Sequence, residues 1–316
     1  MVSTNNLPEW LEDKFKDAEK LYEGDLSTIY YATSISKQEP VIVKEIRAVK
    51  PENYQNLSNF MKKLETLKHP NILPIREIFT NPKELLIAIT YPKATSLEEI
   101  LNERGSILDL DLVTLFSQLL EVLIFAHKQG IPHNSIKPQN VFIEQETCRL
   151  ADWYPCMTFQ SSPAPLLNST SLMKKSTRTI TVSQISYLSP EILDSETSLD
   201  YEKSDLYALG LVGLRALGMT EKEVRELSLV PSKYYDQELN DLDNKLPRAP
   251  KNLTEFLRTL LQRDPALRPT LSQALNSLAF LRGSFSSQFS YTLMNFEGYY
   301  GGIDKFGAMI NNAIGK

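Results

Sequence analysis

Hydrophobic residues near the start of the chain occur in short runs. Residues 21–32 and 41–47 are rich in Tyr, Ile, Val and Thr, and Gly24 followed by Asp25 interrupts the first run. Runs of β-branched and aromatic residues bounded by turn-forming residues predict strands. Residues 83–91 (KELLIAITY) are a further short apolar run, which predicts a buried strand.

Elsewhere the apolar residues recur at helical spacing. Spacings of three and four predict an amphipathic helix over residues 56–67, with Leu57, Phe60, Met61, Leu64 and Leu67 on its apolar face. A long apolar stretch over residues 110–129 ends before Gly130, which is a typical helix stop. Further helices are predicted over residues 204–217, 221–229, 253–262 and 271–281. The pattern therefore predicts an α+β protein with a small β-rich part followed by a larger helical part.

Two segments lack both kinds of periodicity. Residues 160–183 are dense in Ser and Thr, which predicts a solvated loop; Ser161 and Ser162, which precede a proline, make phosphorylation the alternative interpretation. Residues 285–316 combine glycines with aromatic residues and are interpreted as an appended tail.

Composition narrows the class of protein without changing this outline. The chain has 316 residues, a formal net charge of −5 and two cysteines, Cys148 and Cys156. No apolar run approaches the roughly 18–20 residues of a membrane span, and the N-terminus lacks the apolar core of a signal peptide. Without a disulfide framework, and with a negative charge, a soluble cytoplasmic protein that does not bind nucleic acid is predicted.

Several motifs resemble those of protein kinases. Residues 133–140 (HNSIKPQN) resemble the catalytic loop H-R-D-L-K-P-x-N, and residues 150–154 (LADWY) resemble the L-x-D-F-G metal motif. Further partial matches follow in family order: VIVK at 41–44, HPNI at 69–72, SPE at 189–191, DLYALG at 205–210 and RDPALRPT at 263–270. The chain is therefore identified as a Ser/Thr kinase-like member of the protein kinase superfamily.

The resemblance implies a two-lobed kinase fold with one regulatory helix in the small β-rich lobe. The expected organisation is an N-terminal extension at 1–17, a kinase-like domain at 18–283 and a tail at 284–316. Within the domain, the N-lobe covers about 18–92, the C-lobe about 93–283 and the activation segment 152–191.

The catalytic carboxylate of the family falls at Ser135. A serine hydroxyl cannot take up the substrate proton at neutral pH, and loss of such a base typically costs about 10²–10⁴-fold in rate. The neighbouring arginine is replaced by Asn134, while Lys137 matches the lysine of Ser/Thr kinases and is interpreted as vestigial. No residue is therefore assigned a catalytic role.

The nucleotide pocket also departs from the family pattern. Lys44 matches the phosphate-contacting lysine, but its usual glutamate partner is Phe60; Glu65 would substitute only in a shifted helix, so Lys44 is predicted to be unpaired. The Gly-rich loop keeps only Gly24, with Tyr22 and Ser27 at the other glycine positions. Bulky residues at the adenine slot predict a filled, vestigial pocket built from Lys44, Gly24, Ile42, Ile89 and Phe142.

Asn140 and Asp152 match the two metal ligands of the family. Their oxygen atoms suit Mg²⁺, so a magnesium site and a purely local structural role both stay open. Tyr154 replaces the glycine of the metal motif, which predicts one fixed conformation of the activation segment. ATP and Mg²⁺ are compatible with these residues, but neither is expected to be required.

The positions that hold the kinase fold together are intact. Glu191 and Arg268 match a buried ion pair, and Asp205 matches the residue that holds the catalytic loop. His133 matches the spine position of the family, and Trp153, which replaces the phenylalanine of the metal motif, is expected to pack beside it beneath the regulatory helix. This contrast predicts a pseudokinase that acts as a binding or scaffold module, with protein partners contacted through the tail, in a large assembly. The alternative is a weakly active, ATP-dependent Ser/Thr kinase that lacks the usual base.

Overall fold

The protein is described from a computed structural model. The structure describes residues 7–24, 27–107, 109–144, 147–153, 186–194 and 199–292, with side chains described up to Leu281. The expectations for Tyr154, Cys156, the 160–183 loop and the tail beyond Thr292 lie outside these residues.

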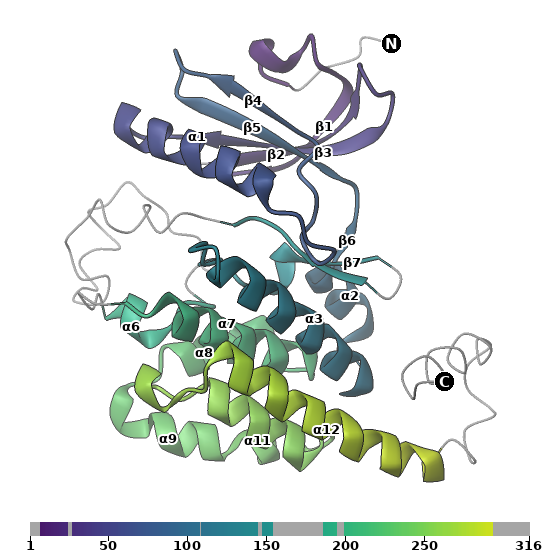
Figure 1. Cartoon of the computed structure of the whole chain (residues 1–316), viewed down its shortest axis with the longest axis vertical. Helices are drawn as coiled ribbons and strands as arrows, with labels where there is room; N and C mark the ends of the chain where they lie inside the picture. Colours follow the sequence, from purple (N-terminus) through teal and green to yellow (C-terminus); the bar gives the residue numbers. More distant parts are fainter. Residues whose placement is uncertain are drawn as a thin grey trace.

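A five-stranded antiparallel sheet forms the small lobe (Figure 1). Its strands are β1 (Phe15–Glu23), β2 (Ser27–Ser34), β3 (Pro40–Arg47), β4 (Glu77–Asn81) and β5 (Leu86–Pro92), in the order β1-β2-β3-β5-β4. The strands predicted around residues 21–32, 41–47 and 83–91 are confirmed. Because β3 pairs with β5 through Lys44 and Ile89, both residues sit in the centre of the sheet.

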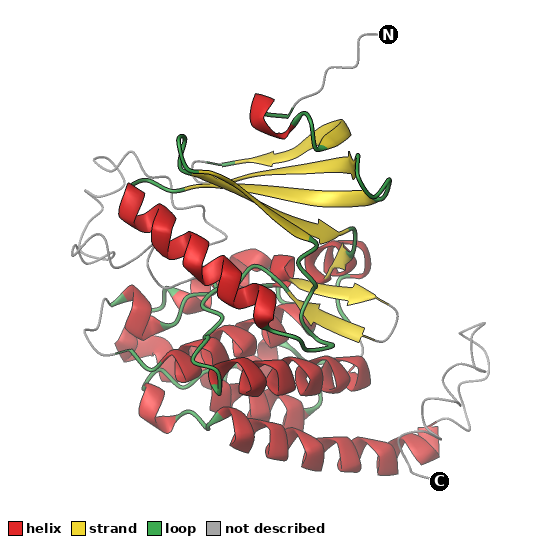
Figure 2. Cartoon of the chain, turned by 45° about the horizontal axis from the view of Figure 1, so that its top comes forward, coloured by secondary structure: helices red, strands yellow, loops and turns green. Residues whose placement is uncertain are grey.

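Helix α1 (Pro51–Thr66) covers one face of this sheet (Figure 2). Leu57, Met61 and Leu64 are buried on its inner side, as the spacing predicted. The helix begins earlier than residue 56 because Pro51 occupies its first turn, where a missing N–H costs nothing.

The opposite face of the sheet is covered by the N-terminal turn, which we define as residues 7–12 with the short helix η1 (Glu9–Leu11). Leu11 is fully buried, and the Trp10 Nε1–H donates to Glu45 Oε1 at 2.8 Å. This turn joins a separate apolar cluster of Leu7, Leu11, Phe15, Ala18, Tyr30, Ala32, Val41, Val43 and Ala88. The small lobe is therefore apolar on both faces.

Helices dominate the large lobe. Its central helix α7 (Tyr201–Ala216) is buried along most of its length. A Cβ atom on Gly213 would lie 2.8 Å from Phe116 Cζ and 2.6 Å from Leu257 Cδ2, so glycine lets neighbouring helices approach closely here. Packed around α7 are α2 (Leu97–Arg104), α3 (Asp109–His127), α8 (Glu221–Ser228), α9 (Ser232–Asn240), α11 (Lys251–Leu260) and α12 (Leu271–Thr292).

Shorter elements complete this lobe. A three-stranded sheet of β6 (Thr95–Ser96), β7 (Val141–Glu144) and β8 (Thr147–Leu150) lies beside the cleft. Short helical turns are η2 (Pro138–Asn140), α6 (Pro190–Leu193), α10 (Leu242–Lys245) and η4 (Pro265–Leu267).

The helical expectations for the large lobe are confirmed, with one correction at its end. Helix α12 continues past residue 281 to Thr292, so the first part of the segment interpreted as a tail is helical (Figure 1). None of the helices within the described residues is both long and apolar enough to cross a bilayer.

Candidate functional site

The loop at residues 133–140 is held from below by Asp205. This buried carboxylate accepts the backbone N–H of His133 at 2.8 Å and that of Asn134 at 2.9 Å. Asn134 has a φ of 61°, a left-handed conformation that asparagine tolerates better than most residues. Two charge-assisted hydrogen bonds therefore fix the strained start of the loop, as predicted for Asp205.

The ring of His133 links this loop to β8. Its Nδ1 accepts the Ser135 N–H at 3.1 Å, so the ring proton is on Nε2, which donates to the Ala151 carbonyl at 3.0 Å. The centroid of the His133 ring lies 4.5 Å from that of Trp153, with the two ring planes tilted by 45°, so the two side chains pack beside each other. Complete burial lowers the pKa of His133 to about 4, so the imidazole is neutral.

Ser135, the third residue of this loop, is hydrogen-bonded to Asn140 at the loop's end. The Asn140 Nδ2 donates to the Ser135 carbonyl at 2.7 Å and to the Ser135 Oγ at 3.1 Å. The amide thus orients the serine hydroxyl and leaves its own Oδ1 as the remaining polar atom.

Lys44 reaches across the cleft to Asp152. The Nζ to Oδ2 distance is 2.6 Å, and the two side chains are 10% and 18% exposed. The prediction of an unpaired Lys44 is therefore wrong. The expected partner position on α1 is Phe60, which carries no charge, and Asp152 pairs with Lys44 instead. Phe60 packs against the core instead, and Glu65 is exposed on α1.

Lys137 lies near this ion pair and is half-buried. Burial lowers the pKa of its ammonium, the charge of Lys44 lowers it further, and Asp152 and Glu221 act in the opposite direction. Lys137 is therefore close enough to Lys44 and Asp152 to share their electrostatic environment.

At the base of the large lobe, Glu191 and Arg268 form a bidentate ion pair. The two N–H···O distances are 2.7 and 2.8 Å, and the side chains are 1% and 0% exposed. Burial opposes ionisation of Glu191, but the hydrogen bonds and charge of Arg268 outweigh it and lower the pKa. The ion pair predicted for Glu191 and Arg268 is thus present.

Comparison with known proteins identifies this arrangement. The family model described as "Protein kinase domain" matches residues 15–280. The chain belongs to the protein kinase family. Its kinase relatives include the serine/threonine-protein kinase cds1 of Schizosaccharomyces pombe, 29% identical over 188 residues that cover 58% of this chain and 38% of the relative. The serine/threonine-protein kinase ICK of Mus musculus is 25% identical over 83% of this chain and 44% of its own length.

A solved kinase structure confirms the fold. The structure titled Rad53 1-466 in complex with AMP-PNP superposes with a TM-score of 0.63 at 19% identity, covering 86% of this chain and 66% of that one. The chain spans less than half the length of the two curated kinases described above. At this identity the likeness shows the two-lobed kinase fold alone.

The kinase metal position keeps two oxygen donors. Asn140 has its Oδ1 available, and Asp152 has its Oδ1, since Oδ2 is paired with Lys44. These hard oxygens suit Mg²⁺, which would neutralise phosphate charge there when bound. The described residues contain no cluster of three or more His, Cys, Asp or Glu side chains that could hold a metal ion.

The residues expected at the nucleotide slot include apolar side chains that are partly or fully buried. Ile42 and Phe142 both pack against the main core cluster, and Ile89 is 1% exposed. Tyr22 lies over Gly24, since a Cβ on that glycine would be 2.6 Å from the Tyr22 hydroxyl. Lys44, Ile42 and Ile89 lie on the paired strands β3 and β5, so these expected pocket residues are close together in the sheet.

Pro92 is a cleft residue that the motif comparison missed. It ends β5, where the chain passes from the small lobe towards β6, and pairs with Val41. A proline has no N–H, so this position cannot donate a hydrogen bond to a base inserted between the lobes. The signal was visible in the sequence, as a proline directly after the apolar run at residues 83–91.

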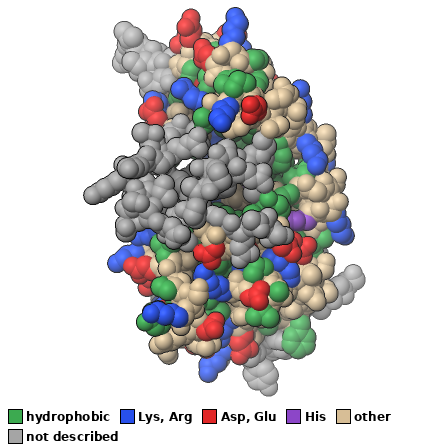
Figure 3. Space-filling model, turned by 90° about the vertical axis from the view of Figure 1, so that its left-hand side faces the viewer, with side chains coloured by type: hydrophobic (Ala, Val, Ile, Leu, Met, Phe, Trp, Pro, Cys, Tyr) green, Lys and Arg blue, Asp and Glu red, His purple; other side chains and the backbone are tan. Residues whose placement is uncertain are grey.

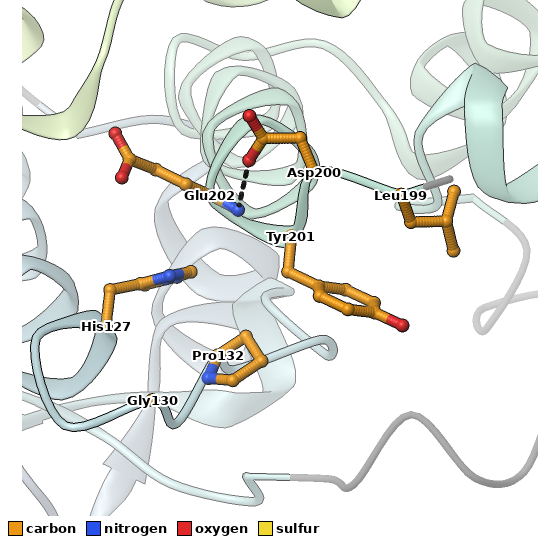
Figure 4. A pocket seen from close by; sticks show the side chains of 7 residues that line it. All are labelled: His127, Gly130, Pro132, Leu199, Asp200, Tyr201 and Glu202. Carbon is orange, nitrogen blue, oxygen red and sulfur yellow. Dashed lines mark hydrogen bonds between the residues drawn. The ribbon is translucent and has the colours of Figure 1, made fainter.

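A hollow of about 570 Å³ lies behind the catalytic loop (Figure 4). His127, Gly130 and Pro132 line one side, and residues 199–202 at the start of α7 line the other. His127 Nε2 is 2.7 Å from Asp205 Oδ2, so one residue that lines the hollow contacts the buried carboxylate that holds the loop. Sequence reasoning missed His127, although it lies in the last turn of the predicted helix.

Proposed function

We propose that this chain is a pseudokinase, a kinase fold that binds partners without transferring phosphate. The observation that carries the proposal is Ser135 at the catalytic-carboxylate position, hydrogen-bonded to Asn140. Phosphoryl transfer in this fold depends on a carboxylate that orients the acceptor hydroxyl. A neutral hydroxyl at that place supplies neither the charge nor the proton acceptor.

The nucleotide slot supports the same proposal. Ile42 and Phe142 belong to the core packing, and Pro92 lacks a donor for a base. The pairing of Lys44 with Asp152 joins the two groups that would otherwise meet phosphate and metal. Neither ATP nor Mg²⁺ is required for the function proposed here.

The alternative is a weakly active Ser/Thr kinase. It is favoured by Lys44, Asn140 and Asp152, which all keep kinase identities and lie around one cleft. The relatives named as Ser/Thr kinases are consistent with this alternative at the level of the family.

Phosphate incorporation from labelled ATP separates the two. Incorporation is measured with Mg²⁺ or Mn²⁺, both into the chain itself and into peptide acceptors. We expect the wild type and the Lys44→Ala and Asp152→Ala variants to incorporate phosphate only at the background level. Incorporation that both substitutions abolish would establish a kinase instead. Ser135→Asp should also stay at background, because restoring the carboxylate leaves Ile42, Phe142 and Pro92 in place.

The function proposed for the fold is to hold protein partners in an assembly in the cytoplasm. Positive and negative side chains are interspersed over the visible surface of both lobes, which suits protein partners better than nucleic acid (Figure 3). The tail is the proposed contact. Because α12 ends at Thr292, removal of residues 293–316 spares the described fold and should abolish partner co-purification; retained co-purification would place the contact elsewhere.

A further inference from the structure

Lys137 is a cation in the cleft to which neither the fold nor the proposed function assigns a role. The Lys137 ammonium makes no hydrogen bond or ion pair with any described residue, although the side chain is half-buried. A buried or half-buried charge without a partner is costly unless it meets a ligand. Three described charges, Lys44, Asp152 and Lys137, act on one another there.

The serine at position 135 leaves the Lys137 ammonium without a nearby ion-pair partner. Asp152 is already paired with Lys44, and Glu221 acts on Lys137 without forming an ion pair with it. A carboxylate at 135 would add a negative charge on the same loop as Lys137, whereas serine adds none. The substitution that removes the base thus leaves a site that attracts an anion.

The serine hydroxyl is also set to donate. Its Oγ accepts the Asn140 amide at 3.1 Å, so its own proton is available for an acceptor oxygen. Ser135 and Lys137 project from the same short loop, which Asp205 fixes from below. A preorganised hydroxyl and ammonium, with Lys44 opposite, match the several acceptor oxygens of a phosphate monoester.

We propose that this cleft binds the phosphate of a phosphoserine or phosphothreonine side chain from a protein partner, without a metal ion. The inference rests on the proposed function, since a chain that transfers phosphate would use the same groups for ATP. It names what the pseudokinase recognises: a side chain that has already been phosphorylated.

Calorimetric titration of the full chain in EDTA tests this proposal. The probe is a short alanine peptide with a central phosphoserine, compared with the same peptide carrying serine. Two or three charge-assisted hydrogen bonds predict a Kd of about 0.1–1 mM for the phosphopeptide. The serine peptide should not bind; equal binding of both peptides, or of neither, overturns the proposal.

Matched variants locate the site. Lys137→Gln should weaken phosphopeptide binding about tenfold or more. Ser135→Asp should abolish it, because the new carboxylate repels the phosphate and removes the donor hydroxyl, while Ser135→Thr should retain it. Lys128→Gln, an exposed lysine at the end of α3, is the control and should bind as wild type. Unchanged binding in Lys137→Gln or Ser135→Asp, with wild-type melting temperatures, contradicts the assignment.

Two further measurements distinguish a failure of this inference from a failure of the proposed function. ATP in EDTA should bind more weakly than the phosphopeptide; tighter ATP binding that depends on Lys137 overturns the choice of a phosphorylated side chain. Incorporation of labelled phosphate would defeat the pseudokinase proposal by itself, whatever the titration shows. Absence of both incorporation and phosphopeptide binding defeats only the inference about the ligand.

Discussion

The base of the large lobe and the floor of the cleft use their polar groups in opposite ways. Arg268 places all five of its N–H donors on described acceptors: Glu191 Oε1 and Oε2 and the carbonyls of Gln262, Lys203 and Arg263. In the cleft, neither the Lys137 ammonium nor the proton of the Ser135 hydroxyl has a hydrogen-bond acceptor among the residues that the structure describes. Complete satisfaction marks a structural contact, and unsatisfied donors mark a place prepared for a ligand.

The ion pair of Glu191 and Arg268 keeps the contacts expected of the kinase fold. The cleft instead has a serine at the position of the family's catalytic carboxylate, while lysines remain at positions 44 and 137. Three measurements test this contrast between the two regions.

The largest effect is expected at the base. Arg268→Ala leaves Glu191 buried without its partner, and breaking such a pair typically costs about 3–5 kcal/mol in the free energy of unfolding. The matched control is Arg263→Ala, whose partner Asp194 is 43% exposed and which should cost below about 1 kcal/mol. Urea denaturation of both variants measures the difference. An equal loss of unfolding free energy in both variants would mean that the buried ion pair of Arg268 contributes no more to stability than a surface ion pair.

A smaller effect is expected in the cleft. Lys44→Met and Asp152→Asn each remove one partner of a largely buried pair, and a hydrogen bond between charged groups is worth about 1.5–3 kcal/mol. Asparagine is the conservative choice because Asp152 has a φ of 61°. A double-mutant cycle should give a coupling of about 1–2 kcal/mol. Coupling near zero would show that the pair contributes nothing to the closed cleft.

The smallest expected effect is a pH dependence of stability that arises from the contact between His127 and Asp205. Burial opposes protonation of His127, but its hydrogen bond to Asp205 and the charges of Asp205, Glu202 and Asp200 outweigh it and raise the pKa. A raised folded-state pKa stabilises the protein fully below the unfolded value of about 6.5, and this contribution is lost as pH rises through the higher folded value.

Melting temperatures at several pH values measure this contribution. The difference between the wild type and His127→Gln should be larger at pH 6 than at pH 9. His69→Gln is the control, because burial lowers the pKa of His69 and its contribution has the opposite dependence on pH. A difference between wild type and His127→Gln that does not change with pH would disprove the proposed link to Asp205.

Much of the fold could be predicted because the relevant signals are local. Helix α1 and the strands around Lys44 and Ile89 follow from spacing alone, and the motifs place Glu191, Asp205 and Arg268. Helix α2 was missed although Ser96 and Glu99 form a capping box, which is a readable start signal. Strand β4 has only five residues with mixed polarity, and its pairing with β5 is not encoded locally.

The site was harder to predict because its contacts join distant parts of the chain. Lys44 and Asp152 are 108 residues apart in sequence. Only the folded structure shows that Asp152 pairs with Lys44 in place of the glutamate that is missing at position 60. The contact between His127 and Asp205 likewise depends on how α3 meets α7. Residue identities predicted which groups are present, and tertiary packing decided which of them are already paired.

The N-terminal turn has a practical consequence for anyone who works with the isolated domain. The match to the kinase family begins at residue 15, yet Leu7 and Leu11 lie before it and are buried against the sheet. A fragment cut at the family boundary would lose the indole that caps Glu45 and would expose an apolar strip around Tyr30 and Val43 to its neighbours in solution. An exposed apolar strip of this kind favours aggregation. An expressed fragment should therefore begin before Leu7 and not at residue 15, where the match to the family begins.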